Sequence, residues 1–462
     1  MIKYTIKQLL KAVGASSGYL SVDIFDRLIT GVSTDSRTIR KGEVFFAIRG
    51  EKFDGADYVG KVIEKGAICA VVNADSMKSE FVNLPFIPVN DTIHALGKAA
   101  GYYRSLFTGT VIAVTGTSGK TTAKEMMLAI LSGSLDVHGT KGNLNNQIGL
   151  PLSVLGLDNN HECAVFELGM SAPGEIAYLA GISRPDIGVI LNAGPAHMEF
   201  FPSLEAVADA KMELLDALGS EETVVINGDD ELLKPSESRS KSRLVRFGIH
   251  GQYDFRAENV VVNPDGCATF YCDGNLITLK VPGIHNVYNA LAAYAVGRLL
   301  GIGSDQAVAA LETFIAPGMR MQVEVKNGIR YINDSYNANP MSMKCAAEVL
   351  KAVEIPNGGR KIAVLGNMLE LGDYSEDAHI STGAIFGSLG LTWLCLVGER
   401  ADEYKRGAIK SGMDTERIRS FPDTDAAAHF LVEIKRPGDV ILVKGSRAME
   451  MGKVLVKIDG SK

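Results

Sequence analysis

Residues 115–122 read Thr-Gly-Thr-Ser-Gly-Lys-Thr-Thr, a run whose side chains and backbone can bind a nucleotide phosphate. Glycines let the backbone turn sharply and bring its N–H groups close to an anion. Lys120 can reach β- and γ-phosphate oxygens, and the Thr121 hydroxyl can bind a Mg²⁺ ion that bridges them. The run is shorter than the usual P-loop, because Val114 stands where that motif has its first glycine. We predict a phosphate loop formed by Gly116, Thr117, Ser118, Gly119, Lys120, Thr121 and Thr122.

The segments around this loop match the elements that must position it. Residues 111–114 are apolar and β-branched, which suits a strand buried on both faces of a parallel sheet. Residues 123–131 favour a helix, whose N-terminus adds partial positive charge. Further strands of this sheet are expected at 164–167, 187–191 and 223–226. Strands alternating with helical stretches are typical of a doubly wound α/β sheet.

Three polar side chains follow these strands and could complete a metal site. Ligands bind at the carboxyl ends of strands in such sheets, where Glu167 and His197 stand, and Lys211 lies in the next helical stretch. Mg²⁺ prefers a hydroxyl, a carboxylate, phosphates and water, so Glu167 fits it better than a histidine does. Each residue also has an ordinary alternative: a helix cap for Glu167, a core histidine for His197 and a solvated lysine for Lys211.

The chain is long enough for about three domains at ~150 residues each. A helical segment at 92–106 and a Pro-Gly break at 317–318 suggest the boundaries. We predict domains at 1–107, 108–316 and 317–462. The expected fold is α/β, with a central P-loop domain that has a mostly parallel sheet. A small N-terminal α/β domain and a C-terminal Rossmann-like α/β domain flank it.

Composition narrows the class of protein further. The net charge of -7 disfavours a nucleic-acid binder, although a local basic site can still bind an anion. The six cysteines include no Cys-x-x-Cys pair and are expected to be reduced thiols. The first residues lack a signal peptide, and no apolar run reaches ~18 residues. We therefore expect a cytoplasmic enzyme with no membrane partner.

Two polar clusters outside the central sheet are also candidates. Asp35-Ser36-Arg37 could hold a diphosphate, because arginine and hydroxyl groups bind phosphate oxygens, or it could be a solvated turn. His285 and Asn289 share one face of the helix expected at 287–300, which could either contact a ligand or arise by chance.

These motifs together resemble the Mur ligase family, the ATP-dependent amide-forming enzymes of peptidoglycan assembly. The blocks that carry the resemblance are 35–37, 45–55, 115–122, 142–151, 167–170, 192–197, 210–213, 283–289, 320, 333–340, 366–372 and 444–447. Blocks 142–151 and 334–340 are most similar to the last ligase of that pathway. The resemblance implies that ATP activates the C-terminal carboxylate of UDP-N-acetylmuramoyl-tripeptide as an acyl phosphate, which D-alanyl-D-alanine then attacks. We expect a monomer.

The resemblance also implies a role for each site residue. Thr121 and Glu167 would bind a first Mg²⁺, and Lys211, commonly carbamylated in this family, would bind a second near His197. The residues expected to be catalytic are Lys120, Lys211 and His197. Those expected to bind ATP, besides the phosphate loop, are Asn289, Arg320 and Asp334. Those expected to bind the other substrates are Ser36, Arg37, Asn143, Asn145, Asn146, Tyr336, Asn337 and Asn339.

Rival interpretations remain from the same and from another class. The ligase that adds the third peptide residue should carry an Asp-Asn-Pro-Arg type motif in its third domain, where this chain has Asn-Ala-Asn-Pro at 337–340. A folate polyglutamate synthase is a second related candidate. A non-catalytic P-loop regulatory protein would leave Glu167, His197 and Lys211 without a task.

Overall fold

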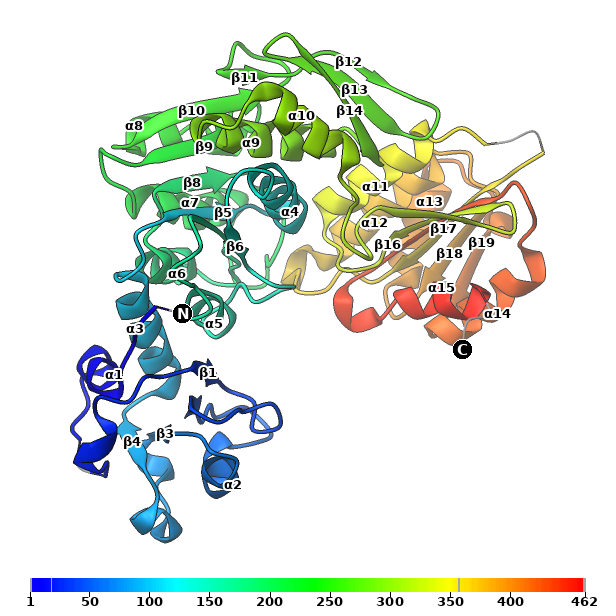
Figure 1. Ribbon diagram of the computed structural model, residues 1–462. Coiled ribbons are helices and arrows are strands. Elements are labelled where there is room, and N and C mark those ends of the chain that lie inside the picture. The colour runs from blue at the N-terminus through cyan, green and yellow to red at the C-terminus, as the bar shows by residue number, and fades with distance from the viewer. Residues whose placement is uncertain (1, 18, 356–357, 460–462) are drawn as a thin grey trace.

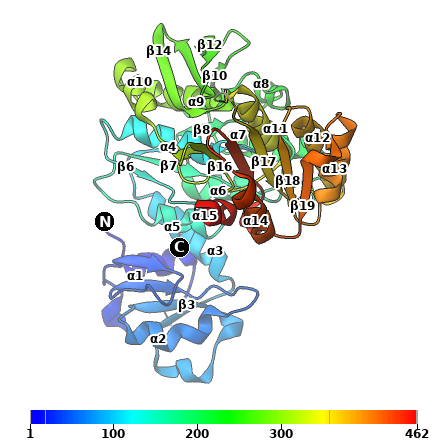
Figure 2. The same ribbon diagram turned by 90° about the vertical axis from the view of Figure 1, so that its right-hand side faces the viewer.

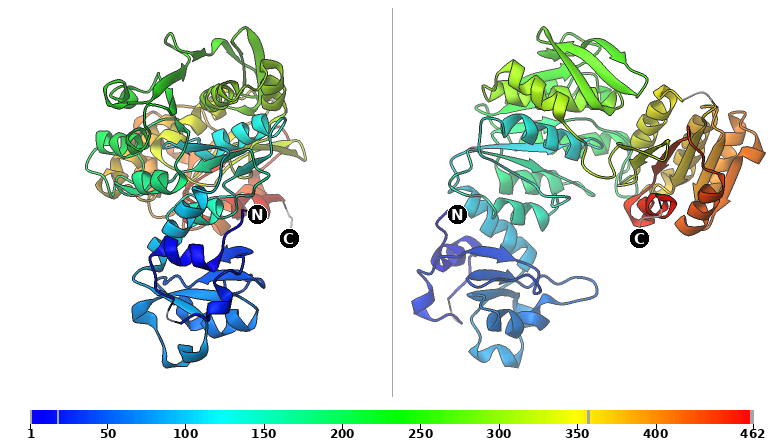
Figure 3. Two further views of the ribbon diagram at one scale, coloured as in Figure 1. Left: turned by 60° about the vertical axis from the view of Figure 1, so that its left-hand side comes forward. Right: turned by 45° about the vertical axis from the view of Figure 1, so that its right-hand side comes forward.

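The computed structural model describes residues 2–17, 19–355 and 358–459. The described chain forms three bodies, each built around its own sheet (Figure 1). The N-terminal body adjoins the central body on one side, and the C-terminal body adjoins the central body on another. Two further orientations show this arrangement (Figures 2 and 3). None of the described helices combines the length and the apolar character that crossing a lipid bilayer requires.

The N-terminal body contains a parallel sheet and a capped first helix. Its strands are β1 (Gly31–Ser33), β2 (Glu43–Phe46), β3 (Cys69–Asn73) and β4 (Phe86–Val89), in that order. Its helices are α1 (Ile6–Val13), α2 (Val59–Glu64) and α3 (Thr92–Arg104). Thr5 and Gln8 form a capping box that starts α1, because each side chain binds the other's backbone N–H.

Helix α3 joins the N-terminal body to the central one. The Tyr103 hydroxyl donates to the Leu157 carbonyl at 2.9 Å, and Arg104 Nε donates to the Ser183 carbonyl at 2.8 Å. Apolar residues of α3 share one core with α5 (Gly149–Val154) and α6 (Glu175–Ser183). The segment before residue 107 therefore packs against the central body as well as against its own sheet.

The central sheet is wholly parallel. Its strands, in sheet order, are β11 (Phe255–Arg256), β10 (Arg243–Gly248), β9 (Thr223–Asn227), β8 (Ile187–Ile190), β5 (Thr110–Thr115), β7 (Cys163–Glu167) and β6 (Val137–Gly139). The prediction of a doubly wound parallel sheet is confirmed. The sequence did not indicate the short edge strands β6 and β11, which carry little periodicity, or β10, which lies between β11 and β9.

Both faces of the central sheet are buried, as the apolar run at 111–114 predicted. Ile112 and Val114 contact the core beneath α4 (Lys120–Leu131) and α9 (His285–Leu299). Val111 and Ala113 face the opposite core, which α7 (Leu204–Asp216) helps to cover. Side chains alternate between faces along a strand, so a sheet covered on both sides requires an unbroken apolar run.

Residues 258–282 form an antiparallel sheet that was not predicted. Its strands are β12 (Glu258–Val262), β13 (Cys267–Cys272) and β14 (Asn275–Pro282). Alternating buried and exposed positions on β14 show why it forms, since one face packs on the core and the other faces solvent. Helix α10 (Ser304–Thr313) packs beside it.

The C-terminal body is a mixed sheet with helices on both faces. Its strands, in sheet order, are β15 (Gln322–Lys326), β16 (Ile329–Asp334), β20 (Val440–Lys444), β17 (Lys361–Gly366), β18 (Trp393–Val397) and β19 (Ile418–Phe421). Only β15 pairs antiparallel among these described strands. The main helices are α11 (Pro340–Ala352), α12 (Ser375–Gly387), α13 (Ala401–Lys410), α14 (Thr424–Ile434) and α15 (Gly452–Asp459). The predicted Rossmann-like architecture is confirmed.

Candidate active site

A cavity of about 490 Å³ lies where the central and C-terminal bodies meet. Most predicted site residues line it, although they come from distant parts of the sequence. They are Thr117, Ser118, Gly119, Lys120, Thr121, Thr122, Asn143, Asn145, Asn146, Glu167, His197, Asn289, Arg320, Asp334, Tyr336, Asn337 and Asn339. The strand register explains the central part, because Val114 of β5 pairs with Glu167 of β7 and the carboxyl ends therefore meet.

The phosphate loop connects β5 to α4 and has the backbone that its glycines predict. Gly119 has φ 84°, and a Cβ there would lie 2.3 Å from the Asn289 Oδ1 atom, so only glycine fits. Asn192 clamps the loop, since its side chain accepts from the Ser118 N–H at 2.9 Å and donates to the Ser118 carbonyl at 3.0 Å. Asn192 follows the strand expected at 187–191, where ligands bind in such sheets, but it was not assigned a role from the sequence.

Lys120 points back along the loop. Its Nζ donates to the Gly116 carbonyl at 2.7 Å. Burial lowers the pKa of Lys120, the Glu167 carboxylate opposes that change, and the Arg320 charge adds to it. Gly116, whose carbonyl accepts the Lys120 hydrogen bond, does not line the cavity. A bound phosphate would give the Lys120 ammonium an anionic partner.

Thr121 and Glu167, the predicted ligands of the first metal ion, are in direct contact. The Thr121 hydroxyl donates to Glu167 Oε2 at 2.7 Å, and Asn145 Nδ2 donates to Glu167 Oε1 at 2.7 Å. Glu167 is 2% exposed and lines the cavity. This contact also places the loop at 143–146 beside the phosphate loop.

The donor set fits a hard cation that keeps other ligands. In the described part of the chain, no three His, Cys, Asp or Glu side chains gather closely enough to hold a metal by themselves. Mg²⁺ commonly binds one or two protein oxygens together with phosphates and water. Thr121 and Glu167 therefore match its requirements in the presence of a nucleotide.

His197 lies at the boundary between the central and C-terminal bodies. Its Nδ1 atom is 2.6 Å from Glu370 Oε2, although the ring is not aligned for a hydrogen bond. Burial lowers the pKa of His197, and Lys120 and Lys211 add to this effect, whereas Glu370 opposes it. His197 and Glu370 both have left-handed backbones, with φ of 57° and 61°. Such conformations persist where the surrounding structure holds them.

Lys211 does not line the cavity. It is 2% exposed on α7, and in its charged form it would lower the pKa of His197. Burial lowers the pKa of Lys211 well below its usual value, and the nearby Lys120 charge adds to this. The neutral amine that burial favours is the form that can react with carbon dioxide.

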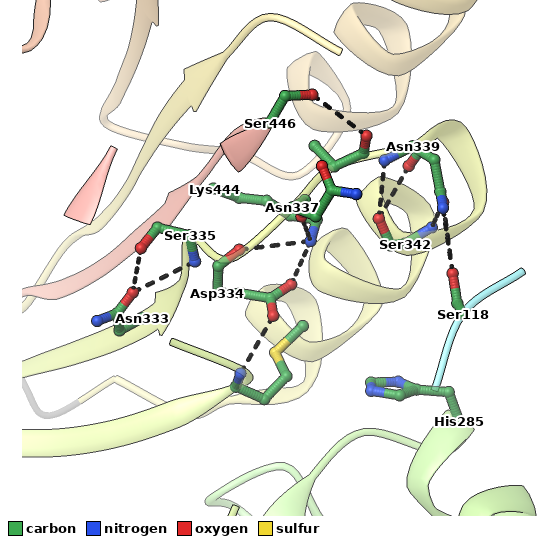
Figure 4. A network of polar contacts seen from close by, with 12 residues as sticks. Ser118, His285, Asn333, Asp334, Ser335, Asn337, Asn339, Ser342, Lys444 and Ser446 are labelled. Carbon is green, nitrogen blue, oxygen red and sulfur yellow. Dashed lines mark hydrogen bonds and ion pairs between the residues drawn. The ribbon is translucent and has the colours of Figure 1, made fainter. Parts of the chain in front are cut away.

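The C-terminal body supplies one wall of the cavity through the loop after β16 (Figure 4). The Ser118 hydroxyl lies 3.4 Å from Asn339 Oδ1, which links the phosphate loop to the N-terminus of α11. Asp334, expected to contact the ATP ribose, forms an ion pair with Lys444 at 2.5 Å. His285, at the start of α9 in the central body, also lines the cavity, and burial lowers its pKa to about 4.

An arginine, a tyrosine and a second arginine form a stack at the cavity edge. The Arg320 guanidinium lies 3.5 Å from the centre of the Tyr336 ring, and that of Arg447 lies 5.3 Å from it. Arg447 Nη1 also donates to the Tyr336 hydroxyl at 3.2 Å. The predicted residues Arg320 and Tyr336 are therefore in contact with each other. Arg447, which was not assigned a role from the sequence, also contacts Tyr336.

Ser36 and Arg37 lie in the N-terminal body and do not line this cavity. Arg37 pairs with Asp35 through its Nη2 atom at 2.7 Å, and its side chain is 85% exposed. The Asp35 pKa is lowered to about 2 by these contacts with Arg37. The cluster forms a turn after β1 in the N-terminal body, whereas the phosphate loop belongs to the central body.

Three family profiles match the chain in consecutive segments. "Mur ligase family, catalytic domain" matches residues 28–104, "Mur ligase middle domain" matches 114–297, and "Mur ligase, glutamate ligase domain" matches 319–447. The chain belongs to the Mur ligase family. The resemblance predicted from the sequence is confirmed, and this Mur ligase is an ATP-dependent ligase.

Relatives of this Mur ligase match it from end to end. It is 35% identical to the UDP-N-acetylmuramoyl-tripeptide--D-alanyl-D-alanine ligase of Bacillus subtilis and 34% identical to that of Escherichia coli, covering 98% of both chains in each case. A MurF crystal structure from Acinetobacter baumannii matches with a TM-score of 0.89 and 30% identity over 99% of both chains. The MurF ligase from Thermotoga maritima in complex with ADP matches with a TM-score of 0.82 and 30% identity, covering 94% of this chain and 97% of that one.

The sequence of this Mur ligase did not assign a role to Asn192, Lys444 and Arg447, which line the cavity, or to Glu370, which contacts His197. Asn192, Glu370 and Arg447 lie in loops that follow strands, and Lys444 is the last residue of β20. The loops were visible as motifs, but their sequence does not reveal which side chain faces the cavity.

Proposed function

We propose that this Mur ligase joins D-alanyl-D-alanine to the C-terminal carboxylate of UDP-N-acetylmuramoyl-tripeptide at the expense of ATP, as the last step of peptidoglycan precursor peptide assembly. The observation that carries the proposal is the meeting of the phosphate loop with the loops of the C-terminal body in one cavity. Relatives named UDP-N-acetylmuramoyl-tripeptide--D-alanyl-D-alanine ligase, which match nearly the full length of the chain, support the choice of substrates.

The chemistry requires two anions to meet. A carboxylate oxygen of the tripeptide attacks the γ-phosphorus, the bond to the β-phosphate oxygen breaks, and ADP leaves. The dipeptide amine, in its neutral form, then attacks the acyl phosphate carbon. The bond from that carbon to the phosphate oxygen breaks, phosphate leaves, and the nitrogen releases a proton to phosphate or solvent as the amide forms. Lys120 and the loop N–H groups would neutralise charge that develops on the phosphates, which is the main electrostatic task of such a site. Arg320 and Asn289 would hold the nucleotide phosphates.

Magnesium ions are part of the proposal. Thr121 and Glu167 would hold a first ion, and His197 with carbamylated Lys211 would hold a second. Such ions neutralise phosphate charge and orient the reacting oxygens. The 2.7 Å contact between Thr121 and Glu167 supports the first assignment. The buried amine of Lys211 supports the second.

The three predicted domains have different tasks in this proposal. Residues 1–107 would hold the UDP end through Ser36 and Arg37, residues 108–316 would bind ATP, and residues 317–462 would contribute to ATP and dipeptide binding. Asn143, Asn145 and Asn146 would guide the tripeptide towards the phosphate loop. Asp334, Tyr336, Asn337 and Asn339 would complete the nucleotide and dipeptide region. The enzyme would act as a cytoplasmic monomer, and closure by hinge motion near residues 107 and 317 would complete the site.

Phosphate release with UDP-N-acetylmuramoyl-tripeptide and ATP, measured with and without D-alanyl-D-alanine, tests the proposal. We expect turnover only when all three substrates are present, with a product whose mass has increased by the dipeptide. Turnover that does not depend on the dipeptide would contradict it. A preference for a single amino acid would favour the third-residue ligase, a folate substrate would favour the polyglutamate synthase, and ATP binding without any turnover would favour a regulatory protein.

A further inference from the structure

Lys124 is a buried lysine that the proposed chemistry does not use. It lies on α4, three positions after Thr121 and four after Lys120, so its side chain shares a face of the helix with theirs. It is 0% exposed and does not line the cavity. A charged amine that has lost its contact with water requires protein partners in its place. The identity of those partners shows what the residue holds.

The Lys124 ammonium contacts a backbone carbonyl and a carboxylate. Its Nζ atom donates to the Thr140 carbonyl at 2.5 Å and lies 2.8 Å from Glu125 Oε1. Thr140 directly follows β6, whose last residue, Gly139, packs closely on α4, because a Cβ there would lie 2.8 Å from Leu128 Cδ1. Lys124 therefore ties the carboxyl end of β6 to the helix that follows the phosphate loop.

Thr140 in turn holds Glu167, the proposed ligand of the first metal ion. The Thr140 hydroxyl accepts from the Glu167 N–H at 3.0 Å, and Thr140 is itself 2% exposed. The carboxylate of Glu167 is held separately, because Thr121 and Asn145 each donate to one of its oxygens at 2.7 Å. Glu167 is therefore fixed through its backbone as well as through its carboxylate.

Thr140 also precedes the loop at 141–147. The loop residues that line the cavity are Asn143, Asn145, Asn146 and Gln147. The far end of the loop is anchored where Asn146 Oδ1 accepts from the Gly149 N–H at 2.9 Å. The near end is anchored at Thr140 by the Lys124 ammonium. One buried lysine thus supports both the proposed metal ligand and the loop proposed to guide the tripeptide.

Resting on the proposed function, we propose that Lys124 is a positioning residue for the divalent cation and the tripeptide. Its ammonium fixes the main chain at Thr140, which sets the position of Glu167 and of the loop at 141–147. Lys124 itself contacts neither the nucleotide nor a substrate. Loss of the ammonium should therefore weaken the use of the cation and of the tripeptide, while the phosphate loop keeps its grip on the nucleotide.

Lys124→Met tests the proposal, because it keeps an unbranched apolar stem and removes the ammonium. We expect the Mg²⁺ concentration for half-maximal activity and the KM for UDP-N-acetylmuramoyl-tripeptide each to rise roughly 10-fold, as the loss of a hydrogen bond from a charged donor predicts. The KM for ATP at saturating Mg²⁺ should stay the same. This split separates positioning of Glu167 and the loop from a general loss of structure, which would raise all three values.

A thermal shift measurement gives a readout that does not depend on turnover. ADP is added either with EDTA or with Mg²⁺, and stabilisation by each mixture reports binding to the folded protein. Wild-type protein should gain additional stabilisation when Mg²⁺ is present. Lys124→Met should keep the shift that ADP gives in EDTA and lose most of the additional shift that Mg²⁺ gives.

Two substitutions of Thr140 test the same link without removing a buried charge. Thr140→Val keeps the shape of the side chain but lacks the hydroxyl that accepts from the Glu167 N–H, so it should show the same loss of the Mg²⁺ shift. Thr140→Ser keeps the hydroxyl and should behave like the wild type. If Lys124→Met yields no folded protein, this pair decides the proposal, and equal behaviour of the two Thr140 variants would overturn it.

Lys361→Met is the matched control for the lysine variant. The Lys361 Nζ atom also donates to a backbone carbonyl, that of Lys351 at 2.8 Å, but Lys361 lies on β17 and does not line the cavity. It should change neither the Mg²⁺ requirement nor any KM value. A Lys124→Met protein that matches this control would overturn the proposal. A higher KM for ATP with a smaller ADP shift in EDTA would also overturn it, because it would assign Lys124 to the phosphate loop.

Failure of this inference can be separated from failure of the proposed function. Wild-type enzyme that forms no amide with D-alanyl-D-alanine would overturn the proposed function and the role towards the tripeptide. The Mg²⁺ shift with ADP would still decide the role of Lys124 towards the cation, because it requires no amide formation. Active wild-type enzyme whose Lys124 and Thr140 variants keep the Mg²⁺ shift and the KM for the tripeptide would overturn only the inference.

Discussion

Lys444 and Asp334 stand opposite one another on neighbouring strands and form a buried ion pair. The parallel register of β16 and β20 pairs these residues directly, and their atoms Nζ and Oδ2 are 2.5 Å apart. Lys444 also donates to the Asn337 carbonyl at 3.0 Å. The pair therefore fixes the loop at 335–339, which carries Tyr336 and Asn339 to the cavity.

Lys444→Met should destabilise the C-terminal body. The Lys444 side chain is 2% exposed and that of Asp334 is 13% exposed, so the variant leaves a carboxylate without its partner in a buried place. Breaking such a pair costs about 3–5 kcal/mol. Urea denaturation followed by intrinsic fluorescence measures the change.

Lys453→Met is the control for this prediction. Lys453 pairs with Glu450, and both side chains are more than half exposed. Its loss should cost at most ~1 kcal/mol, because solvent screens exposed pairs. Equal stability of the two variants would contradict a structural role for the buried pair.

Lys120→Ala should remove most of the turnover. The side chain supplies positive charge where phosphate oxygens are expected, and loss of one such stabilising group lowers kcat by roughly 10²- to 10³-fold. A coupled assay of ADP formation measures this rate. Lys280→Ala, an exposed lysine on β14, should behave like the wild type, and a near-normal kcat for Lys120→Ala would show that the phosphates lie elsewhere.

Lys211→Ala should be inactive and should regain part of its activity when short carboxylic acids are added. A carbamate on this buried lysine would act as a carboxylate, and a small acid can occupy the space that the side chain leaves. Turnover at increasing acetate or formate concentrations measures the rescue. The absence of rescue would count against carbamylation. A mass increase of intact wild-type protein that disappears on acidification would support it independently.

His379 should make the C-terminal body sensitive to acid. Its Nε2 accepts from the Met368 N–H at 3.0 Å, its Nδ1 is 2.6 Å from the Ser375 carbonyl, and the residue is fully buried. Burial lowers the pKa of His379 in the folded protein. The unfolded chain takes up the proton near pH 6.5 while the folded chain resists it, so stability should fall as the pH drops below about 6.5.

The slope of this loss is limited to ~1.4 kcal/mol per pH unit for one proton. His379→Gln should give a shallower pH dependence of the denaturation midpoint between neutral and mildly acidic buffers. His429→Gln, an exposed histidine of the same body, should keep the wild-type dependence. A slope that is the same in all three proteins would assign the acid sensitivity to other groups.

The sequence by itself determined the elements and the residue types at their ends. The run at 111–114 predicted a doubly buried strand because its apolar residues do not alternate with polar ones, and Gly119 and Lys120 marked the phosphate loop. Glu167, which ends β7, was visible for the same reason, and His197 lies in the loop after β8. The capping box of Thr5 and Gln8 is likewise local, because it needs no distant partner.

Only the tertiary structure decided which side chains meet. Thr121 and Glu167 are 46 positions apart, and their contact depends on the pairing of β5 with β7. The pairing of Asp334 with Lys444 spans 110 positions and likewise follows from strand order. Glu370 reaches His197 because two bodies lie side by side. Strand order and the packing of the bodies depend on the burial of apolar residues that are far apart in the sequence. The local periodicity of a segment does not indicate which distant segment it will contact.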